Sequence, residues 1–140
     1  MYLLDTNVIS ELRKASRAHV SVRAWAESAK ARSFWLSAIT VLELEIGVLR
    51  IERRDPAQGA LLRQWLEKGV LAQFEERILD VDVAIARRSA RLHVPDSRPE
   101  RDALIAATAL THGLAVVTRD AGDFEPMGVA VINPWLSPGA

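Results

Sequence analysis

The chain has 140 residues, is 49% hydrophobic and 26% charged, carries no formal net charge at pH 7 and contains no cysteine. This length and composition are typical of one globular domain with a full hydrophobic core, so we expect a single domain over residues 1–140. The zero net charge argues against bulk binding of long duplex DNA, the lack of cysteine excludes disulfides and thiolate metal sites, and no apolar run is long enough to span a bilayer. We therefore expect a soluble, cytoplasmic protein.

The hydrophobic pattern predicts strands that alternate with helices along the chain. The expected strands are short and lie at residues 2–4, 34–37, 77–79, 115–118 and 130–132. The expected helices begin near residue 7, span 19–30, 39–53, 56–74 and 83–92, and begin again at residue 102. A polar loop is expected at 94–99 and an irregular tail at 133–140. Because strand and helix alternate, the sequence predicts an α/β fold with a short, mainly parallel sheet of about five strands.

Local signals place several helix ends. Asp55 followed by Pro56 predicts a helix start, since Asp caps the free N–H groups and Pro suits the first helical position. Asp82 is a second expected cap, and Gly69 is expected to weaken or bend the helix that contains it. His112 before a glycine marks a helix end. For helix 19–30, the expected inner face consists of Val20, Trp25 and Ala29.

The helices at 39–53 and 56–74 form an expected helical hairpin. It carries more apolar residues than one face of a sheet requires, namely Leu42, Ile46, Leu49, Leu61, Trp65 and Leu66. Such residues can form a surface for a partner, or they can all pack inward. The sequence alone leaves both interpretations open.

The strongest functional signal is the first stretch, MYLLDTNVISEL. Its apolar strand runs directly into Asp5, followed by the polar Thr6 and Asn7 and then a helical pattern. In open parallel sheets, ligands bind beyond the carboxyl ends of the strands, which is where Asp5 is expected. The same three residues could equally serve only as a helix cap.

Further carboxylates occur in similar settings. Glu43 lies in the opening turns of the helix after the second strand, Asp102 opens a helix of small residues, and Asp120 and Asp123 follow the strand at 115–118. Gathered at one rim of the sheet, such groups repel one another by about 4 kcal/mol per pair at a partly buried site, so they need a cation. Oxygen ligands without Cys or paired His favour Mg²⁺ or Mn²⁺ over Zn²⁺. Glu45 is excluded, because two positions along a helix turn it about 200° from Glu43.

Five motifs follow one another along nearly the whole chain: Asp5-Thr6-Asn7, SAITVLELEIGVL around Glu43, DALIAATALTHG from Asp102, VVTRDAGDFEPMGV from Val116 and the closing INPW at 132–135. In content and order they resemble the PIN-domain ribonucleases. Within that family the chain looks most similar to the toxin half of bacterial VapBC-type toxin–antitoxin pairs, the FitB-like group included.

The resemblance implies a PIN-like three-layer α/β/α fold with a protruding helical hairpin. It also implies an Mg²⁺- or Mn²⁺-dependent endoribonuclease that is the toxin of a type II pair, with RNA as substrate, a cognate antitoxin, a homodimer, and DNA contacted only through the antitoxin. It assigns an acidic, metal-binding set of four residues, namely Asp5, Glu43, Asp102 and Asp120. Asn7 and Thr118 are assigned as supporting residues. Many relatives carry Asn at the place of Asp120, so Asp123 is an alternative fourth ligand. The identity of the RNA and the number of metal ions stay open.

Two other classes compete with a nuclease. A PIN-like module could bind RNA or protein without cutting, although the intact acidic set argues against this. An aspartate-based phosphatase would also place Asp after the first strand, but the dehalogenase type requires a second Asp where this chain has Asn7. Among the basic residues, Arg98, Arg101 and Arg119 flank the expected site. The four tryptophans are expected in the core and at interfaces rather than as stacking platforms for bases.

Overall fold

The computed structural model of the protein describes residues 1–136. At its centre is a narrow sheet of five strands: β1 (Tyr2–Leu4), β2 (Phe34–Ser37), β3 (Ile78–Leu79), β4 (Ala115–Val117) and β5 (Val131–Ile132). The strand order is β3-β2-β1-β4-β5, and every neighbouring pair is parallel. The predicted α/β fold with a short parallel sheet is therefore confirmed.

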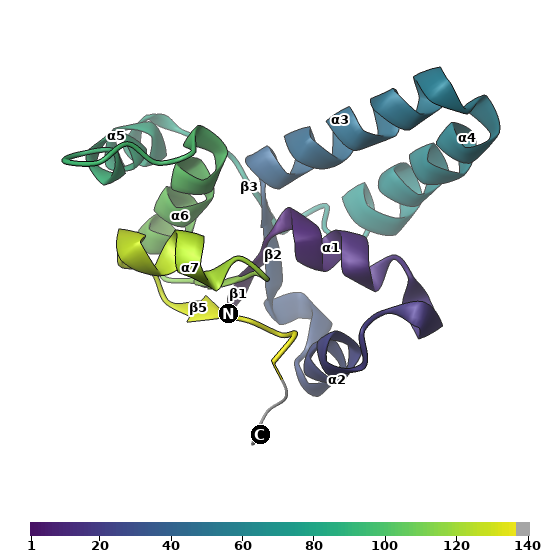
Figure 1. Ribbon diagram of the computed structural model, residues 1–140, viewed down its shortest axis with the longest axis horizontal. Helices are drawn as coiled ribbons and strands as arrows, with labels where there is room; N and C mark the ends of the chain where they lie inside the picture. Colours follow the sequence, from purple (N-terminus) through teal and green to yellow (C-terminus); the bar gives the residue numbers. More distant parts are fainter. Residues whose placement is uncertain (137–140) are drawn as a thin grey trace.

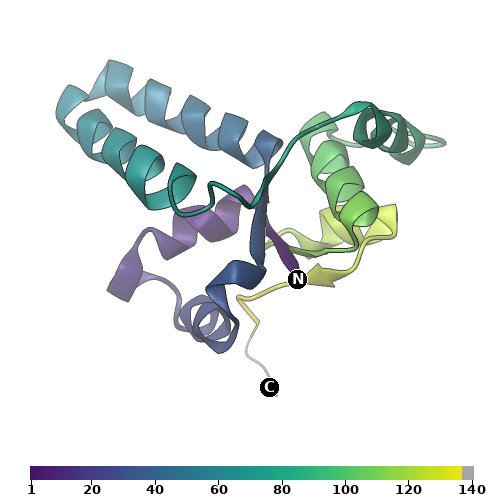
Figure 2. The same cartoon turned by 180° about the vertical axis from the view of Figure 1, so that it is seen from behind.

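Helices cover both faces of this sheet and make three layers (Figure 1). They are α1 (Thr6–Leu12), α2 (Val20–Ser28), α3 (Ala38–Arg54), α4 (Pro56–Gln64), α5 (Val83–Leu92), α6 (Glu100–His112) and α7 (Ala121–Phe124). A π-helical segment, η3 (Trp65–Leu71), continues α4, and short 3-10 turns occur at η1 (Ala15–Arg17), η2 (Ala31–Ser33) and η4 (Glu125–Met127). Seen from behind, α5, α6 and α7 lie on one side of the sheet and the remaining helices on the other (Figure 2).

One helix begins earlier than the sequence predicts, and another was not predicted. The helix expected to open at Asp102 begins two residues earlier, at Glu100, directly after Pro99. Proline fixes its own backbone in an extended turn, so the helix can start at the next residue. The short helix α7 was not predicted, because four residues are too few for a helical period to show in the sequence.

The core is divided by the sheet, since successive strand residues point to opposite faces. Leu3 and Val116 pack against α6 and α7, whereas Leu4 and Val117 pack against α1, α3 and η3. All four are at most 1% exposed. The small residues of α6 are buried against the sheet, so this helix lies close to β1 and β4 and brings its first turn to the sheet edge.

The predicted caps are confirmed. Asp55 accepts a hydrogen bond from the N–H of Gln58, and Asp82 accepts one from the N–H of Ile85. Helix α6 ends at Gly113, whose φ of 67° lies in the left-handed region that glycine adopts at helix ends. Gly69 lies within the π-helical segment, which confirms a distortion of the predicted helix at that point.

The inner face predicted for α2 is wrong at Val20, which is 66% exposed. Val22 is the fully buried residue instead. Trp25 and Ala29 pack inward as predicted, against the core cluster that contains Leu4 and Val117. Trp25 and Ala29 lie three and seven positions after Val22, which is helical spacing, whereas Val20 is turned about 200° from Val22.

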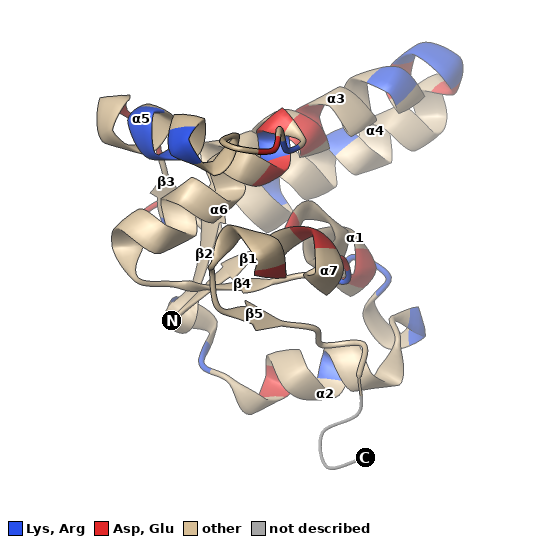
Figure 3. Cartoon of the chain, turned by 60° about the vertical axis from the view of Figure 1, so that its left-hand side comes forward, with Lys and Arg blue, Asp and Glu red and all other residues tan. Residues whose placement is uncertain are grey.

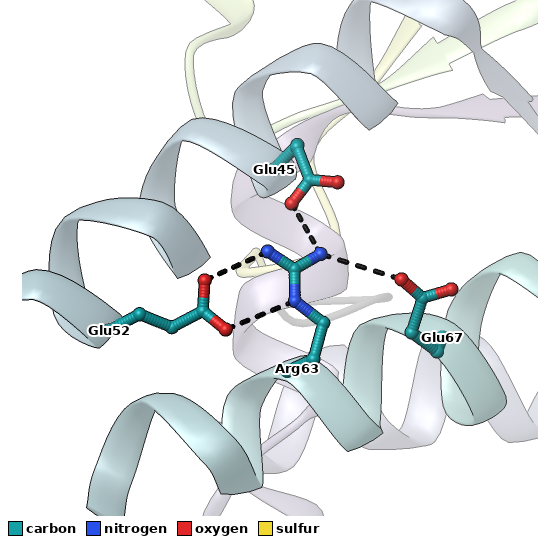
Figure 4. Close-up of polar contacts among 4 residues, drawn as sticks. All are labelled: Glu45, Glu52, Arg63 and Glu67. Atoms are coloured by element: carbon teal, nitrogen blue, oxygen red, sulfur yellow. Dashed lines mark hydrogen bonds and ion pairs between the residues drawn. The ribbon is translucent and has the colours of Figure 1, made fainter. Parts of the chain in front are cut away.

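Helices α3 and α4 form a hairpin that extends away from the sheet, with basic residues at its far end (Figure 3). Arg63 of α4 joins the two helices through ion pairs with Glu45 and Glu52 of α3, and it also contacts Glu67 (Figure 4). The helices approach closely at Gly59, where a Cβ atom would lie 2.4 Å from the Cα of Glu52. The two helices of the hairpin are thus joined by the guanidinium of Arg63 and can approach closely because Gly59 has no side chain.

The apolar residues of the hairpin divide between two environments. Leu66 is fully buried, whereas Leu42, Leu49 and Leu61 are 44%, 53% and 63% exposed. Only part of the predicted apolar set therefore packs inward. No helix within residues 1–136 is both long and apolar enough to cross a lipid bilayer.

The strand order creates a crevice at one edge of the sheet. From β1 the chain moves through β2 and β3 on one side, and it returns to β4 and β5 on the other. The carboxyl ends of β1 and β4 are therefore neighbours at the point where the strand order reverses. Open α/β sheets bind ligands at such a switch point.

Candidate active site

Asp5 follows β1 directly and is 6% exposed. It caps α1, since its Oδ1 accepts a hydrogen bond from the Thr6 N–H at 2.9 Å, and its Oδ2 accepts one from the Thr118 hydroxyl at 2.8 Å. Burial raises the pKa of Asp5, these two hydrogen bonds lower it, and the nearby charges of Glu43 and Asp120 raise it again. Asp5 can therefore both cap α1 and serve in a functional site. The cap uses only one carboxylate oxygen, and the carboxylate lies at the carboxyl end of β1.

Thr118 and Asn7 connect Asp5 to Asp120. The Thr118 hydroxyl, which donates to Asp5, also accepts hydrogen bonds from the Asp120 N–H at 3.0 Å and from Asn7 Nδ2 at 3.4 Å. Asn7 Nδ2 also donates to Asp120 Oδ2 at 3.2 Å. The first helix and the segment after β4 are thereby joined by side chains that hold two carboxylates in place.

Glu43 enters the same site from α3. Its Oε1 accepts a hydrogen bond from the Thr6 hydroxyl at 2.7 Å, and its Oε2 lies 3.7 Å from a guanidinium nitrogen of Arg101. Arg101 is more than half exposed, so this ion pair compensates little of the negative charge. Glu45, two positions on, contacts Arg63 within the hairpin, in agreement with its exclusion from the site.

Asp102 lies in the first turn of α6 and is half-buried. Its pKa is raised to about 6, first by burial and then by the charges of Asp5, Asp123, Glu43 and Asp120, in that order of size. Within residues 1–136 no hydrogen bond donor or cation reaches its carboxylate to offset this repulsion. The raised pKa of Asp102 therefore reflects burial first and the surrounding negative charge second.

The carboxylates described above lie around one open cavity of about 520 Å³. The predicted residues that line it are Asp5, Asn7, Glu43, Asp102 and Asp120. Thr118 lies behind them, fully buried. Asp123 is exposed on α7 and is not among the lining residues, although its charge acts on Asp102.

The chemical properties of these carboxylates suit the binding of a divalent cation. All are hard oxygen ligands, they converge from four segments of the chain, and two of them have pKa values raised by burial and mutual repulsion. Within residues 1–136 no three Asp, Glu, His or Cys side chains lie close enough to enclose an ion as they stand. Mg²⁺ does not require such an enclosure, because it keeps several waters and commonly binds through one or two carboxylates.

The cavity also has lining residues that the sequence analysis missed: Ser10, Glu11, Arg13, Lys14 and Trp135. Ser10, Glu11 and Lys14 lie three, four and seven positions after Asn7, so helical spacing from Asn7 was a signal that could have found them. Glu11 accepts hydrogen bonds from the His19 N–H and from Lys14 Nζ, which lower its pKa. Of the flanking arginines, Arg119 lines the cavity.

The fold and the site define a class of protein, namely α/β proteins with a carboxylate-lined cleft at the switch point of a parallel sheet. A family model described as "PIN domain" matches residues 2–128. The chain belongs to the PIN-domain family.

Its relatives cover almost the full chain. It is 39% identical over 140 residues to the VapC ribonuclease Y4jK of Sinorhizobium fredii, which covers 96% of this chain and 98% of that protein. It is 40% identical over 141 residues to toxin FitB of Neisseria gonorrhoeae, covering 96% and 99%. The crystal structure of FitAcB from the same organism superposes with a TM-score of 0.88 at 39% identity, covering 96% of this chain and 99% of that one. The predicted family and fold are thereby confirmed.

Proposed function

We propose that this protein is an Mg²⁺- or Mn²⁺-dependent endoribonuclease and the toxin of a type II toxin–antitoxin pair, and that it acts in the cytoplasm as one domain. The observation that carries the proposal is the convergence of Asp5, Glu43, Asp102 and Asp120 on one open cavity. The names of two relatives, a VapC ribonuclease and a toxin, support it.

In this proposal the metal ion would bind among the four carboxylates, through one or two of them directly and through its waters to the others. A bound divalent cation supplies Lewis-acid stabilisation of a phosphodiester and lowers the pKa of a coordinated water. The chain's own contribution is to fix the ligands: Thr118 holds Asp5, Asn7 holds Asp120, and Thr6 holds Glu43. Because these hydrogen bonds join α1, α3 and the end of β4, the positions of Asp5, Glu43 and Asp120 are supported without the ion.

The assay is cleavage of a labelled single-stranded or looped RNA. Cleavage is expected with Mg²⁺ or Mn²⁺ and is expected to stop when EDTA is added. Asp5→Asn should abolish cleavage without unfolding the chain, because it removes a ligand and its repulsion together. Asp80→Asn, an exposed carboxylate before α5, is the matched control and should cleave normally. Full cleavage by a folded Asp5→Asn protein would refute the assignment.

The proposal includes a protein partner. A nuclease that cuts the host's own RNA must be inhibited during growth, and a basic side chain from an antitoxin would pair with the acidic cavity. The exposed Leu42, Leu49 and Leu61 offer apolar surface on the hairpin for the antitoxin or for a second copy of the chain. Contact with DNA would come through the antitoxin alone. Expression of this chain should arrest growth, co-expression of the antitoxin should relieve the arrest, and light scattering should show at least two copies in solution.

A further inference from the structure

The cavity has a basic wall beside its acidic one. Arg13, at the end of α1, and Arg119, directly after Thr118, both line it. Each guanidinium lies over a tryptophan ring: Arg119 is 4.8 Å from the centroid of Trp135, and Arg13 is 5.8 Å from the centroid of Trp65. Two cations of the same cavity thus lie over aromatic faces.

This mode of support leaves the binding edge of each arginine unused. A guanidinium that lies over an indole ring is attracted by the electrons of the ring face, and this attraction does not occupy its five N–H donors. Within residues 1–136, no hydrogen bond or ion pair involves either guanidinium. Lys14, the third cation of the cavity, is bound to Glu11. Arg13 and Arg119 are therefore the cavity's cations with donors available to an anion.

Arg119 is also fixed to the acidic cluster through its backbone. Its N–H donates to Asn7 Oδ1 at 3.3 Å, and its carbonyl accepts from Asn133 Nδ2 at 3.4 Å. Asn133 Oδ1 in turn accepts a hydrogen bond from the Trp135 N–H at 3.0 Å. Since Asn7 also holds Asp120, the arginine, its tryptophan and the carboxylate have a fixed spacing.

We propose that Arg119 and Arg13 bind the phosphates that neighbour the scissile one, so that a single RNA strand is drawn along the acidic cavity. This inference rests on the proposed nuclease function. A cluster of carboxylates repels every phosphate of the strand, and a metal ion offsets this only at the scissile position. The neighbouring phosphates require cations of their own, and the planar guanidinium fork matches phosphate oxygens. Trp135 and Trp65 act as positioning residues that hold the two forks.

The test measures RNA binding separately from cleavage. Fluorescence anisotropy of a labelled single-stranded RNA is recorded at several salt concentrations in an Asp5→Asn background, which prevents cleavage. Arg119→Ala and Arg13→Ala should each weaken binding about tenfold and reduce the slope of log K against log salt by about 0.7, the value for one phosphate contact on a single strand. Arg54→Ala, at the far end of the hairpin, should change neither.

Two further variants test the positioning role. Trp135→Leu keeps the charge of Arg119 but removes its support, so the salt slope should stay while affinity falls about threefold, and Trp135→Phe should restore binding. In the chain with Asp5 intact, Arg119→Ala should raise KM with little change in kcat, as expected for uniform binding. Suppose that Arg119→Ala and Arg13→Ala show the same affinities and salt slopes as Arg54→Ala, while the wild-type chain cleaves the same RNA. That result would overturn this inference and leave the proposed function standing. A wild-type chain that cleaves no RNA would overturn the proposed function, and this inference with it.

Discussion

Replacing Asp102 by Asn should stabilise the protein while it removes the activity. In the structure, burial and four nearby carboxylates raise the pKa of Asp102 from 3.8 to about 6. A shift of about two units corresponds to roughly 3 kcal/mol between the two protonation states. Asp102 is only half-buried, so solvent screening reduces this value, and loss of a favourable charge in the first turn of α6 subtracts about 0.5 kcal/mol more. We therefore expect Asp102→Asn to stabilise the fold by about 1 kcal/mol at pH 7.

The pH dependence gives this prediction its direction. Because the folded-state pKa lies above the unfolded one, the wild-type chain loses stability as the pH rises from about 4 to about 6, when the unfolded state releases the proton first. The variant has no such group at position 102. The two proteins should therefore have equal stability below pH 4, apart from any constant offset, and should diverge up to pH 6.

Thermal unfolding with EDTA present measures this difference. At pH 7 the variant should melt roughly 3 °C higher than the wild type, and the difference should shrink toward pH 4. Adding Mg²⁺ should raise the melting temperature of the wild type more than that of the variant, because the ion binds the intact set. Asp80→Asn controls for the substitution itself and should show no pH-dependent difference. The reasoning would be refuted if Asp102→Asn were no more stable than the wild type at pH 7, or if the difference in melting temperature did not change with pH.

Three further outcomes are expected. Asp120→Ala should weaken Mn²⁺ binding more than Asp123→Ala in calorimetric titrations, because Asp120 lines the cavity and Asp123 does not; the reverse order would transfer the ligand role. Gly59→Ala should destabilise the chain by about 3 kcal/mol in urea unfolding, since its Cβ would meet the backbone of α3, whereas Gly47→Ala has open space and should be neutral or slightly stabilising. Leu49→Asp should weaken antitoxin binding in a pull-down and leave RNA cleavage by the free protein intact; unchanged binding would remove the hairpin from the proposed interface.

Short-range features of this protein were determined by its sequence alone. The caps at Asp55 and Asp82 and the helix end at Gly113 were predictable because each depends on residues at most four positions apart. The position of Asp5 was predictable for the same reason, since it lies between an apolar strand and the helix that it caps. The alternation of strands and helices along the chain was also predictable, because it requires only the order of the hydrophobic segments.

The assembly of the site was decided by the tertiary structure. Whether β4 lies beside β1 depends on strand pairing across more than a hundred residues, and this pairing brings Thr118 to Asp5. Helical periodicity does not report such contacts. Trp135 was expected in the core or at an interface; it does pack against the core cluster that contains Leu4 and Val117, but it also lines the cavity, where hydrogen bonds of Asn133 connect its backbone to that of Arg119. A sequence can thus show which carboxylates have the right local setting, but only the packed sheet determines which of them, and which cations, share one cavity.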